Sequence, residues 1–492
     1  MITDRNSTPD RLSYARLSRR SVLKATSGLS AALAAPAVLR RQAAGQESAS
    51  IPAGMALVSS PRLPLTAIGS QDVAGIFGGE TTAWEAAGSP IALAIELLAI
   101  DGQIPAGAPV LETFPDYGEL AVQLGTRPGA VALVPVDQVD FRANVIAVDG
   151  FDPLRDAPVG EEKAIRIGVV GDIVPGRNVH NKMVAYGDFT HPFKKAASDL
   201  SSYDLAFANL EGNLSPNIAP PADAHTFSFV SDPAMIEGFK LAGIDAVSLA
   251  NNHARWNSAG WGESAFLDTI DSLDAAGMSH FGGGRDLDQA RAPWVTMIGD
   301  KRVAVIGIDG VTANEEARAD GATVNLSELG ASEYAGASAG VAGTNPYVLT
   351  DVLADIEFLV SQYDIVIPYF HMGVEYVAVP PQWAVMGARA AIDVGATMVV
   401  TNHPHVIQGM EVHGGKPIVY SVGNFVFDQM FAVDVRQGNI LEIVIRGNSV
   451  VGLRFKGVEI EDFNQPRLMR TGEHASQMDR FWSATDRLAS GG

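Results

Sequence analysis

The fold of this chain is decided by the stretch Ile165-Arg-Ile-Gly-Val-Val-Gly-Asp-Ile-Val-Pro-Gly-Arg177. Its first half is apolar and rich in β-branched residues, a pattern that predicts a buried strand ending at Gly171-Asp172. Six further apolar runs follow, each with a polar side chain within two residues of its end: 204–208, 245–250, 303–308, 364–370, 397–401 and 418–422.

Helical segments are expected between these strands, at 233–241, 259–276, 348–361 and 380–394. Repeated alternation of strand and helix predicts an α/β sheet whose two faces are covered by helices. The ligands of such sheets bind outside the carboxyl ends of the strands. Because nearly every strand delivers Asp, Glu, Asn or His at that end, we expect one functional site there.

Six of these polar residues form a coherent ligand set: Asp172, Glu211, Asn252, His371, His403 and His405. Two carboxylates, one amide and three imidazoles offer mixed oxygen and nitrogen ligands for two divalent cations. A set without sulfur favours manganese, iron or zinc over copper(I). Two such ions about 3.5–4 Å apart clamp the attacking and leaving oxygens of an in-line displacement, so phosphoester hydrolysis is expected.

Two further residues have expected catalytic roles beside this set. His253 is a candidate proton donor, and Arg177 offers its planar fork to a phosphoryl or carboxylate oxygen. Taken singly, each motif also has a structural interpretation. Gly171-Asp172 fits a turn, His371 fits a hydrogen-bonded core histidine, and Asn251-Asn252 fits a turn and helix cap.

Six motifs follow one another in an order typical of one family: Gly171-Asp172 to Arg177, Asn209-Leu210-Glu211, Leu249 to His253, His371-Met-Gly-Val-Glu-Tyr376, His403-Pro-His405 and Tyr420-Ser-Val-Gly-Asn-Phe-Val-Phe-Asp428. From Ile165 to Gln429 the chain resembles the CapA-type capsule synthesis proteins, which belong to the calcineurin-like metallophosphoesterase superfamily. This resemblance implies a four-layer α/β/β/α sandwich with two sheets, in place of a single sheet.

The resemblance also implies metal positions at the six ligand residues and a general acid at His253. Three positions depart from the family pattern. Val174 replaces a histidine two residues after the first aspartate, Trp256 replaces an aspartate after the Asn-Asn-His motif, and Asn402 replaces a histidine before His403. The first departure leaves one metal position with fewer ligands, and the other two bear on catalytic competence.

The composition excludes several classes of function. A net charge of −21 argues against a nucleic-acid partner, because phosphate backbones would be repelled. The 492 residues allow two or three domains, and 47% hydrophobic with 18% charged residues indicate a folded protein. The absence of cysteine excludes disulfides, thiolate metal ligands and cysteine nucleophiles.

The N-terminus predicts export. Arg19 and Arg20 precede a short apolar run from Ala25 to Leu39, which is the twin-arginine pattern. The run is shorter than the roughly 20 residues that span a bilayer, which favours a signal peptide over a membrane anchor. We therefore expect a twin-arginine signal over residues 1–45 and a periplasmic, cell-envelope or extracellular location.

The rest of the chain divides into three predicted parts. Residues 50–155 form a smaller α/β accessory domain, and the segments Val73 to Phe77 and Pro128 to Pro135 resemble half of a periplasmic phosphate-binding protein. Residues 163–470 form the metallophosphoesterase-like domain, which includes a hairpin around Arg446-Gly447-Asn448. Residues 471–492 are expected to be a polar tail that ends in a short helix.

These observations support two main functions. The first is a two-metal hydrolase of a phosphoester, or of an amide-linked polymer, in capsule or poly-γ-glutamate biosynthesis at the cell envelope. The alternative is a non-catalytic envelope factor that binds or transfers an anionic polymer, together with the polymer synthesis machinery. A third, weaker interpretation is a solute-binding protein that uses the N-terminal region.

The export prediction can be tested in cells. Replacing Arg19 and Arg20 together by lysine should leave the precursor in the cytoplasm, because the twin-arginine pathway reads the arginine pair. Fractionation of cells that produce the wild type or the double variant measures this. Unchanged delivery of the double variant out of the cytoplasm would contradict the assignment.

Overall fold

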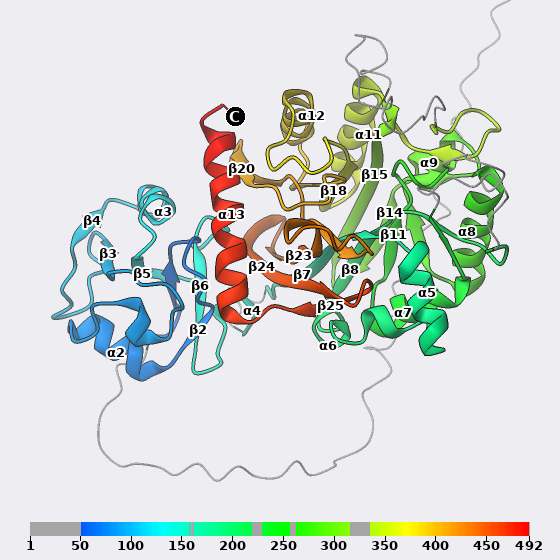
Figure 1. Ribbon diagram of the computed structural model, residues 1–492. Helices are drawn as coiled ribbons and strands as arrows, with labels where there is room; N and C mark the ends of the chain where they lie inside the picture. Colours follow the sequence, from blue (N-terminus) through cyan, green and yellow to red (C-terminus); the bar gives the residue numbers. More distant parts are fainter. Residues whose placement is uncertain are drawn as a thin grey trace, which may run out of the picture.

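Two β-sheets lie face to face at the centre of the main body of the molecule (Figure 1). This computed structural model describes residues 51–156, 159, 162–218, 229–255, 262–314 and 335–491. Within these residues the first sheet has the order β12-β11-β8-β7-β23-β24-β25, with β22 beside β7. The second has the order β14-β15-β18-β19-β21-β20, with β17 beside β15.

The strands of the first sheet are β7 (Ile165–Ile173), β8 (Leu205–Leu210), β11 (Ala246–Ser248), β12 (Ser279–Phe281), β22 (Asn424–Val426), β23 (Gln437–Arg446), β24 (Ser449–Glu461) and β25 (Gln465–Leu468). Those of the second are β14 (Trp294–Ile298), β15 (Lys301–Asn314), β17 (Pro346–Tyr347), β18 (Ile365–His371), β19 (Val399–Asn402), β20 (Met410–His413) and β21 (Lys416–Val419). β7, β8 and β11 run parallel, as do β15, β18, β19 and β21.

Helices cover the outer face of each sheet. The helices α5 (Arg177–Tyr186), α7 (Ile236–Ala242) and α8 (Gly262–Ala276) pack on the first sheet, and α11 (Leu349–Gln362) and α12 (Gln382–Asp393) pack on the second. Between the sheets, Ile167 and Phe207 of the first share a core with Val305 and Tyr369 of the second.

The predicted four-layer α/β/β/α sandwich is therefore confirmed. The single sheet that strand–helix alternation alone predicts is wrong. Periodicity reports that a strand is buried, but it does not report which strand lies beside it.

Local signals set the bounds of several elements. The helix predicted at 233–241 begins as the 3₁₀ turn η3 (Pro233–Met235), where the Asp232 carboxylate accepts a hydrogen bond of 2.8 Å from the Ala234 backbone N–H. It ends at Gly243, whose left-handed φ of 71° closes α7. The predicted hairpin is confirmed, because β23 and β24 pair antiparallel with Arg446 opposite Ser449.

A separate mixed sheet precedes the sandwich, with the order β2-β6-β1-β5-β3-β4 (Figure 1). Its elements are β1 (Met55–Ser59), β2 (Ala67–Ile68), α2 (Ser70–Gly78), β3 (Glu96–Ile100), β4 (Glu112–Phe114), α3 (Tyr117–Thr126), β5 (Ala130–Pro135) and β6 (Asn144–Val148). One of its two apolar cores includes Leu154 and reaches Val444 of β23. Arg454 of β24 also pairs with Asp152 at 2.5 Å, so the two parts are packed against each other.

The expected polar tail is instead a 19-residue helix, α13 (Thr471–Ala489). Met478 and Phe481 are buried in the core between the two sheets, and Arg62 of the N-terminal part stacks on Trp482 at 5.1 Å. Most residues of this segment are polar, so its composition does not indicate that the few apolar residues lie on one face of a helix. The packing of that face against the sheets makes the pattern evident. Figure 1 shows α13 between the N-terminal sheet and the sandwich.

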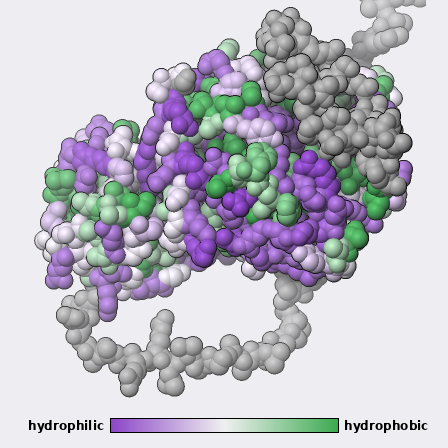
Figure 2. Space-filling view, in the orientation of Figure 1, coloured by the Kyte–Doolittle hydropathy of each residue, from purple (hydrophilic) through white to green (hydrophobic). Residues whose placement is uncertain are grey.

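The visible surface is mainly hydrophilic, with smaller apolar patches near its centre and over the N-terminal part (Figure 2). Among the described residues, no helix has the length and apolar character needed to cross a bilayer. The predicted signal at residues 1–45 lies outside the described residues.

The role of α13 can be tested by truncating one buried side chain. Phe481→Ala should lower the free energy of unfolding by about 3–5 kcal/mol, because it removes a fully buried ring from the sheet–sheet core. Urea unfolding measures the change. Ser483→Ala, at an exposed position of the same helix, is the matched control and should leave the midpoint nearly unchanged. Equal midpoints for the two variants would show that α13 does not belong to the core.

Candidate metal centre

Polar side chains from both sheets meet at the carboxyl ends of the strands. Asp172 lies near the end of β7, Glu211 follows β8, and His371 is the last residue of β18. Asn252 follows β11, and the His403-Pro404-His405 turn follows β19. The structure thus brings all six predicted ligand residues to one place, because parallel strands end at the same edge of each sheet.

Glu211 belongs to two groups of potential ligand atoms. Its carboxylate and atoms of Asp172 and His405 all lie within 4.8 Å of one another, and the same holds for Glu211, His371 and His403. Asn252 joins the second group, since its Oδ1 lies 2.7 Å from His371 Nε2. Two overlapping groups that share one carboxylate offer ligand atoms for two neighbouring ions.

The surroundings of Glu211 fit a cation. The side chain has no solvent exposure, and neither carboxylate oxygen accepts a hydrogen bond from a described residue. The nearest nitrogens, Nε2 of His371 and of His405, each lie 3.6 Å from Oε1. A buried carboxylate without donors is costly, and a divalent cation bound by oxygen and nitrogen ligands would satisfy it.

Burial and neighbouring charges displace the pKa values of these groups in opposite directions. Burial and the charge of Asp172 raise the pKa of Glu211 to about 7. Burial also acts to raise the pKa of Asp172, but His405 and His371 hold it below its ordinary value. The two carboxylates overcome the opposing effect of burial and raise the pKa of His405 to about 10. Burial and the neighbouring imidazoles hold the pKa of His403 well below its usual range, which favours the neutral form of this ring.

A layer of asparagines orients the ligands. Asn209 donates from Nδ2 to Asp172 Oδ1 at 2.7 Å, and its Oδ1 accepts from Asn251 Nδ2 at 3.0 Å. Asn424 Oδ1 lies 2.9 Å from His405 Nδ1. Sequence reasoning quoted these asparagines within motifs but assigned them no role in orienting the ligands. Their position next to a ligand or at a strand end is the signal that could have found them.

Two departures from the family pattern have clear structural roles. Asn402 accepts hydrogen bonds from Ser421 Oγ at 3.0 Å and from the Val422 N–H at 3.2 Å. It therefore connects the end of β19 to the segment that follows β21. Val174 is buried in an apolar cluster with Phe229 and Phe427 and offers no ligand. The third departure, at position 256, lies outside the described residues.

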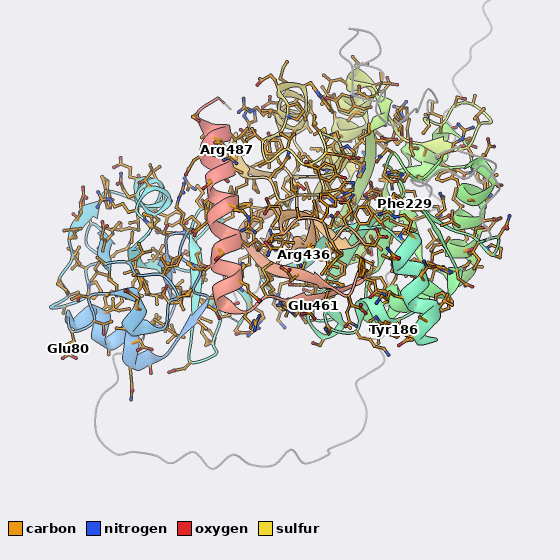
Figure 3. All side chains as sticks on the ribbon, viewed as in Figure 1. Glu80, Tyr186, Phe229, Arg436, Glu461 and Arg487 are labelled. Carbon is orange, nitrogen blue, oxygen red and sulfur yellow. The ribbon has the colours of Figure 1, made fainter. Side chains whose placement is uncertain are left out.

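His253 lies beside the cluster and outside both groups of described ligand residues. Its Nε2 is 3.9 Å from Glu211 Oε1, and its ring packs 4.5 Å from the ring of Phe229, the residue labelled in Figure 3. The imidazole is therefore close to the site while its orientation is set by an aromatic contact.

Arg177, expected to contact an anion, has a protein partner instead. Its guanidinium pairs with Asp428 through Nη2 and through Nε, the latter at 3.2 Å, and it lies 4.9 Å from the Phe229 ring and 5.4 Å from the Phe427 ring. Two of the three guanidinium nitrogens, Nε and Nη2, are thus paired with a carboxylate of the protein itself. Arg177 also borders a cavity of about 430 Å³, together with Tyr376 and Phe431.

Several residues around the centre have left-handed backbone angles. The φ angles are 109° at His403, 57° at His405, 61° at Tyr376 and 53° at Arg177. Such angles strain residues other than glycine, and strain of this kind concentrates at functional sites. The His-Pro-His turn is therefore held in a conformation that the chain would not adopt alone.

The sandwich and the buried carboxylate–histidine cluster together define the class of metallophosphoesterase-like proteins. Within that class, the family described as "Bacterial capsule synthesis protein PGA_cap" matches residues 166–429, and the chain belongs to this family of CapA-type proteins. The capsule biosynthesis protein CapA of Bacillus anthracis is 27% identical over 273 residues, which cover 55% of this chain and 61% of that relative. The match therefore spans less than two thirds of the relative.

Two solved structures show weaker likenesses. A 5′-nucleotidase from Staphylococcus aureus has a TM-score of 0.32 at 12% identity, over 64% of this chain and 58% of that one. An ABC-type phosphate transport receptor from Vibrio cholerae has a TM-score of 0.19 at 18% identity, over 20% of this chain and 48% of that one. Both TM-scores are too low to support a conclusion about function.

The burial of Glu211 leads to a prediction about the protein stripped of metal. The pKa of Glu211 rises from 4.5 to about 7 on folding, so its ionisation costs stability as the pH rises through that window. Glu211→Gln removes this cost. The free energy of unfolding of Glu211→Gln minus that of wild type should therefore be larger near pH 8 than near pH 5.

Urea unfolding at both pH values, after chelation, measures this difference. Added manganese should reverse the order and stabilise wild type more than the variant, because an ion that binds the native state stabilises it. A difference that is independent of pH would contradict the argument.

Proposed function

We propose that this protein is an exported, metal-dependent phosphoesterase of capsule or poly-γ-glutamate biosynthesis. The observation that carries the proposal is Glu211, a carboxylate with no solvent exposure and no hydrogen-bond donor among the described residues, shared by two ligand groups. Its neighbours supply only oxygen and nitrogen ligands, which suit manganese, iron or zinc. The family match supports the placement in capsule synthesis.

The two ligand groups divide the residues between two positions. Asp172 and His405 would hold one ion, Asn252, His371 and His403 would hold the other, and Glu211 would lie between them. Bound ions of this kind polarise a phosphoryl oxygen and lower the pKa of water. The protein contributes buried, preoriented ligands and the exclusion of bulk water from the reacting atoms.

His253 would act as the general acid. Its Nε2 faces the Glu211 carboxylate at 3.9 Å, which places a ring N–H at the edge of the centre where a leaving oxygen would take the proton. The contact with the Phe229 ring limits rotation of the imidazole. Neither feature requires His253 to bind metal.

A non-catalytic factor that binds or transfers an anionic polymer is the second candidate. A polyanion needs accessible positive charge, but Arg177 is paired with Asp428 and the whole chain has a net charge of −21. Bound cations would therefore have to supply the attraction. That observation favours the hydrolase, with a phosphoester at the cell envelope as its substrate and the polymer synthesis machinery as its surroundings.

Single-residue variants separate the two candidates. His253→Ala should keep metal content and folding but lower turnover of aryl phosphates by about 10²–10⁴-fold, the usual contribution of a general acid. Asp172→Ala and His403→Ala should lose metal as well as turnover. Elemental analysis of the purified proteins and hydrolysis of phosphomonoester and phosphodiester substrates provide the measurements.

The matched control is His413→Ala, which removes a surface histidine of β20 paired with Asp393. It should change neither metal content nor rate. A wild-type protein that holds metal yet turns over no member of a broad phosphoester panel would overturn the hydrolase in favour of the polymer-binding factor.

A further inference from the structure

Glu375 forms a third group of potential ligand atoms that the six predicted residues do not include. Its carboxylate and nitrogens of His403 and His405 all lie within 4.8 Å of one another. His405 belongs to the group around Asp172, and His403 belongs to the group around His371. Glu375 is also less buried than these ligands, so it lies on the solvent side of the cluster.

Backbone hydrogen bonds hold the loop that carries Glu375 against the His403-Pro404-His405 turn. The Met372 N–H donates to the Asn402 carbonyl at 2.9 Å, and the Tyr376 N–H donates to the Pro404 carbonyl at 2.8 Å. These two hydrogen bonds lie on either side of Glu375 and join its loop to the turn that holds both histidines. The position of the carboxylate is therefore set by the fold and not by the side chain alone.

The same loop adopts an unusual backbone conformation. Gly373 has a φ of 127°, and a Cβ atom there would lie only 3.2 Å from Pro404 Cγ. Tyr376 has a φ of 61°, and its hydroxyl accepts a hydrogen bond of 2.8 Å from Gln429 Nε2. Glycine adopts such an angle without strain, but at Tyr376 the left-handed angle is strained and must be offset elsewhere, which indicates that the conformation of this loop serves the site.

The ion position next to Asp172 has fewer protein ligands than an ion usually binds, and the Glu375 carboxylate could supply another. Val174 stands where the superfamily pattern has a histidine, and it packs in an apolar cluster with Phe229 and Phe427. Only three described residues, Asp172, Glu211 and His405, form the group at this position. Structural zinc and related ions usually have four or more ligands.

We propose that Glu375 is a further metal ligand, which closes the centre on its solvent side next to His405 and His403. The proposal rests on the metal centre of the proposed function and deepens it. A third carboxylate adds a hard oxygen donor and a negative charge, which strengthens binding of manganese or zinc relative to softer ions.

Metal titration of the chelator-treated full-length protein tests this inference. Glu375→Ala should weaken binding of one of two manganese ions by more than the 10–100-fold typical of residues that only orient ligands. Glu375→His should restore most of the lost affinity, because an imidazole is also a metal ligand. In the cobalt-substituted protein, the visible absorption should change in Glu375→Ala and partly return in Glu375→His.

Glu357→Gln is the matched control, since it removes one negative charge from an exposed position of α11. It should leave both affinities unchanged. Urea unfolding of the metal-free variants checks that Glu375→Ala still folds; if it does not, Glu375→Gln replaces it in the titration.

The outcomes separate the two proposals. Wild type that binds no divalent ion would overturn the proposed function and this inference together. Wild type that binds two ions, with Glu375→Ala of equal affinity and unchanged cobalt spectrum, would overturn only the role of Glu375. A third outcome is that Glu375→Ala loses affinity and Glu375→His does not restore it. That result would assign Glu375 an electrostatic role and exclude it as a ligand.

Discussion

The burial of two carboxylates among imidazoles is the constraint on which the rest of the structure depends. Asp172 and Glu211 have no solvent exposure, and a buried anion is tolerated only when charges, hydrogen bonds or metal ions compensate it. Asp172 Oδ1 accepts a hydrogen bond from Asn209, and its Oδ2 pairs with His405 Nδ1 at 3.2 Å. Glu211 accepts no hydrogen bond on either oxygen from the described residues, and its nearest imidazole nitrogens lie 3.6 Å away, which makes it the centre of the proposed metal site.

Two rigid sheets allow such a site to exist on strained loops. The strand ends of both sheets converge, and the amides of Asn209, Asn251 and Asn424 connect the loops that extend from them. The left-handed backbone at His403 and His405 is held by this framework. In this arrangement the protein framework itself positions the side chains of the proposed metal centre, as catalysis by preorganised groups requires.

The whole chain is strongly acidic, with a net charge of −21, and this bears on what it can bind. The fork of Arg177 is occupied by Asp428, and both aromatic rings that flank the guanidinium also pack against histidines of the site. Arg177 therefore stabilises the wall of the centre more directly than it attracts an anion. Positive charge for a phosphoryl group or a polymer carboxylate would come from bound ions.

The sequence by itself determined the central strands of the sandwich, the helices α7, α8, α11 and α12, and the candidate ligand residues, because these depend on local periodicity and on which residue follows each strand. Only the tertiary structure decided the division into two sheets, the burial of α13, and the pairing of Arg177 with Asp428 across 251 positions. The proximity of Glu375 to His403 and His405 is likewise a product of the tertiary structure. These features depend on contacts between segments far apart in the chain, and local pattern does not report such contacts. Glu375 was visible within a quoted motif, but its closeness to both histidines arises from hydrogen bonds between two loops that only the folded sheet brings together.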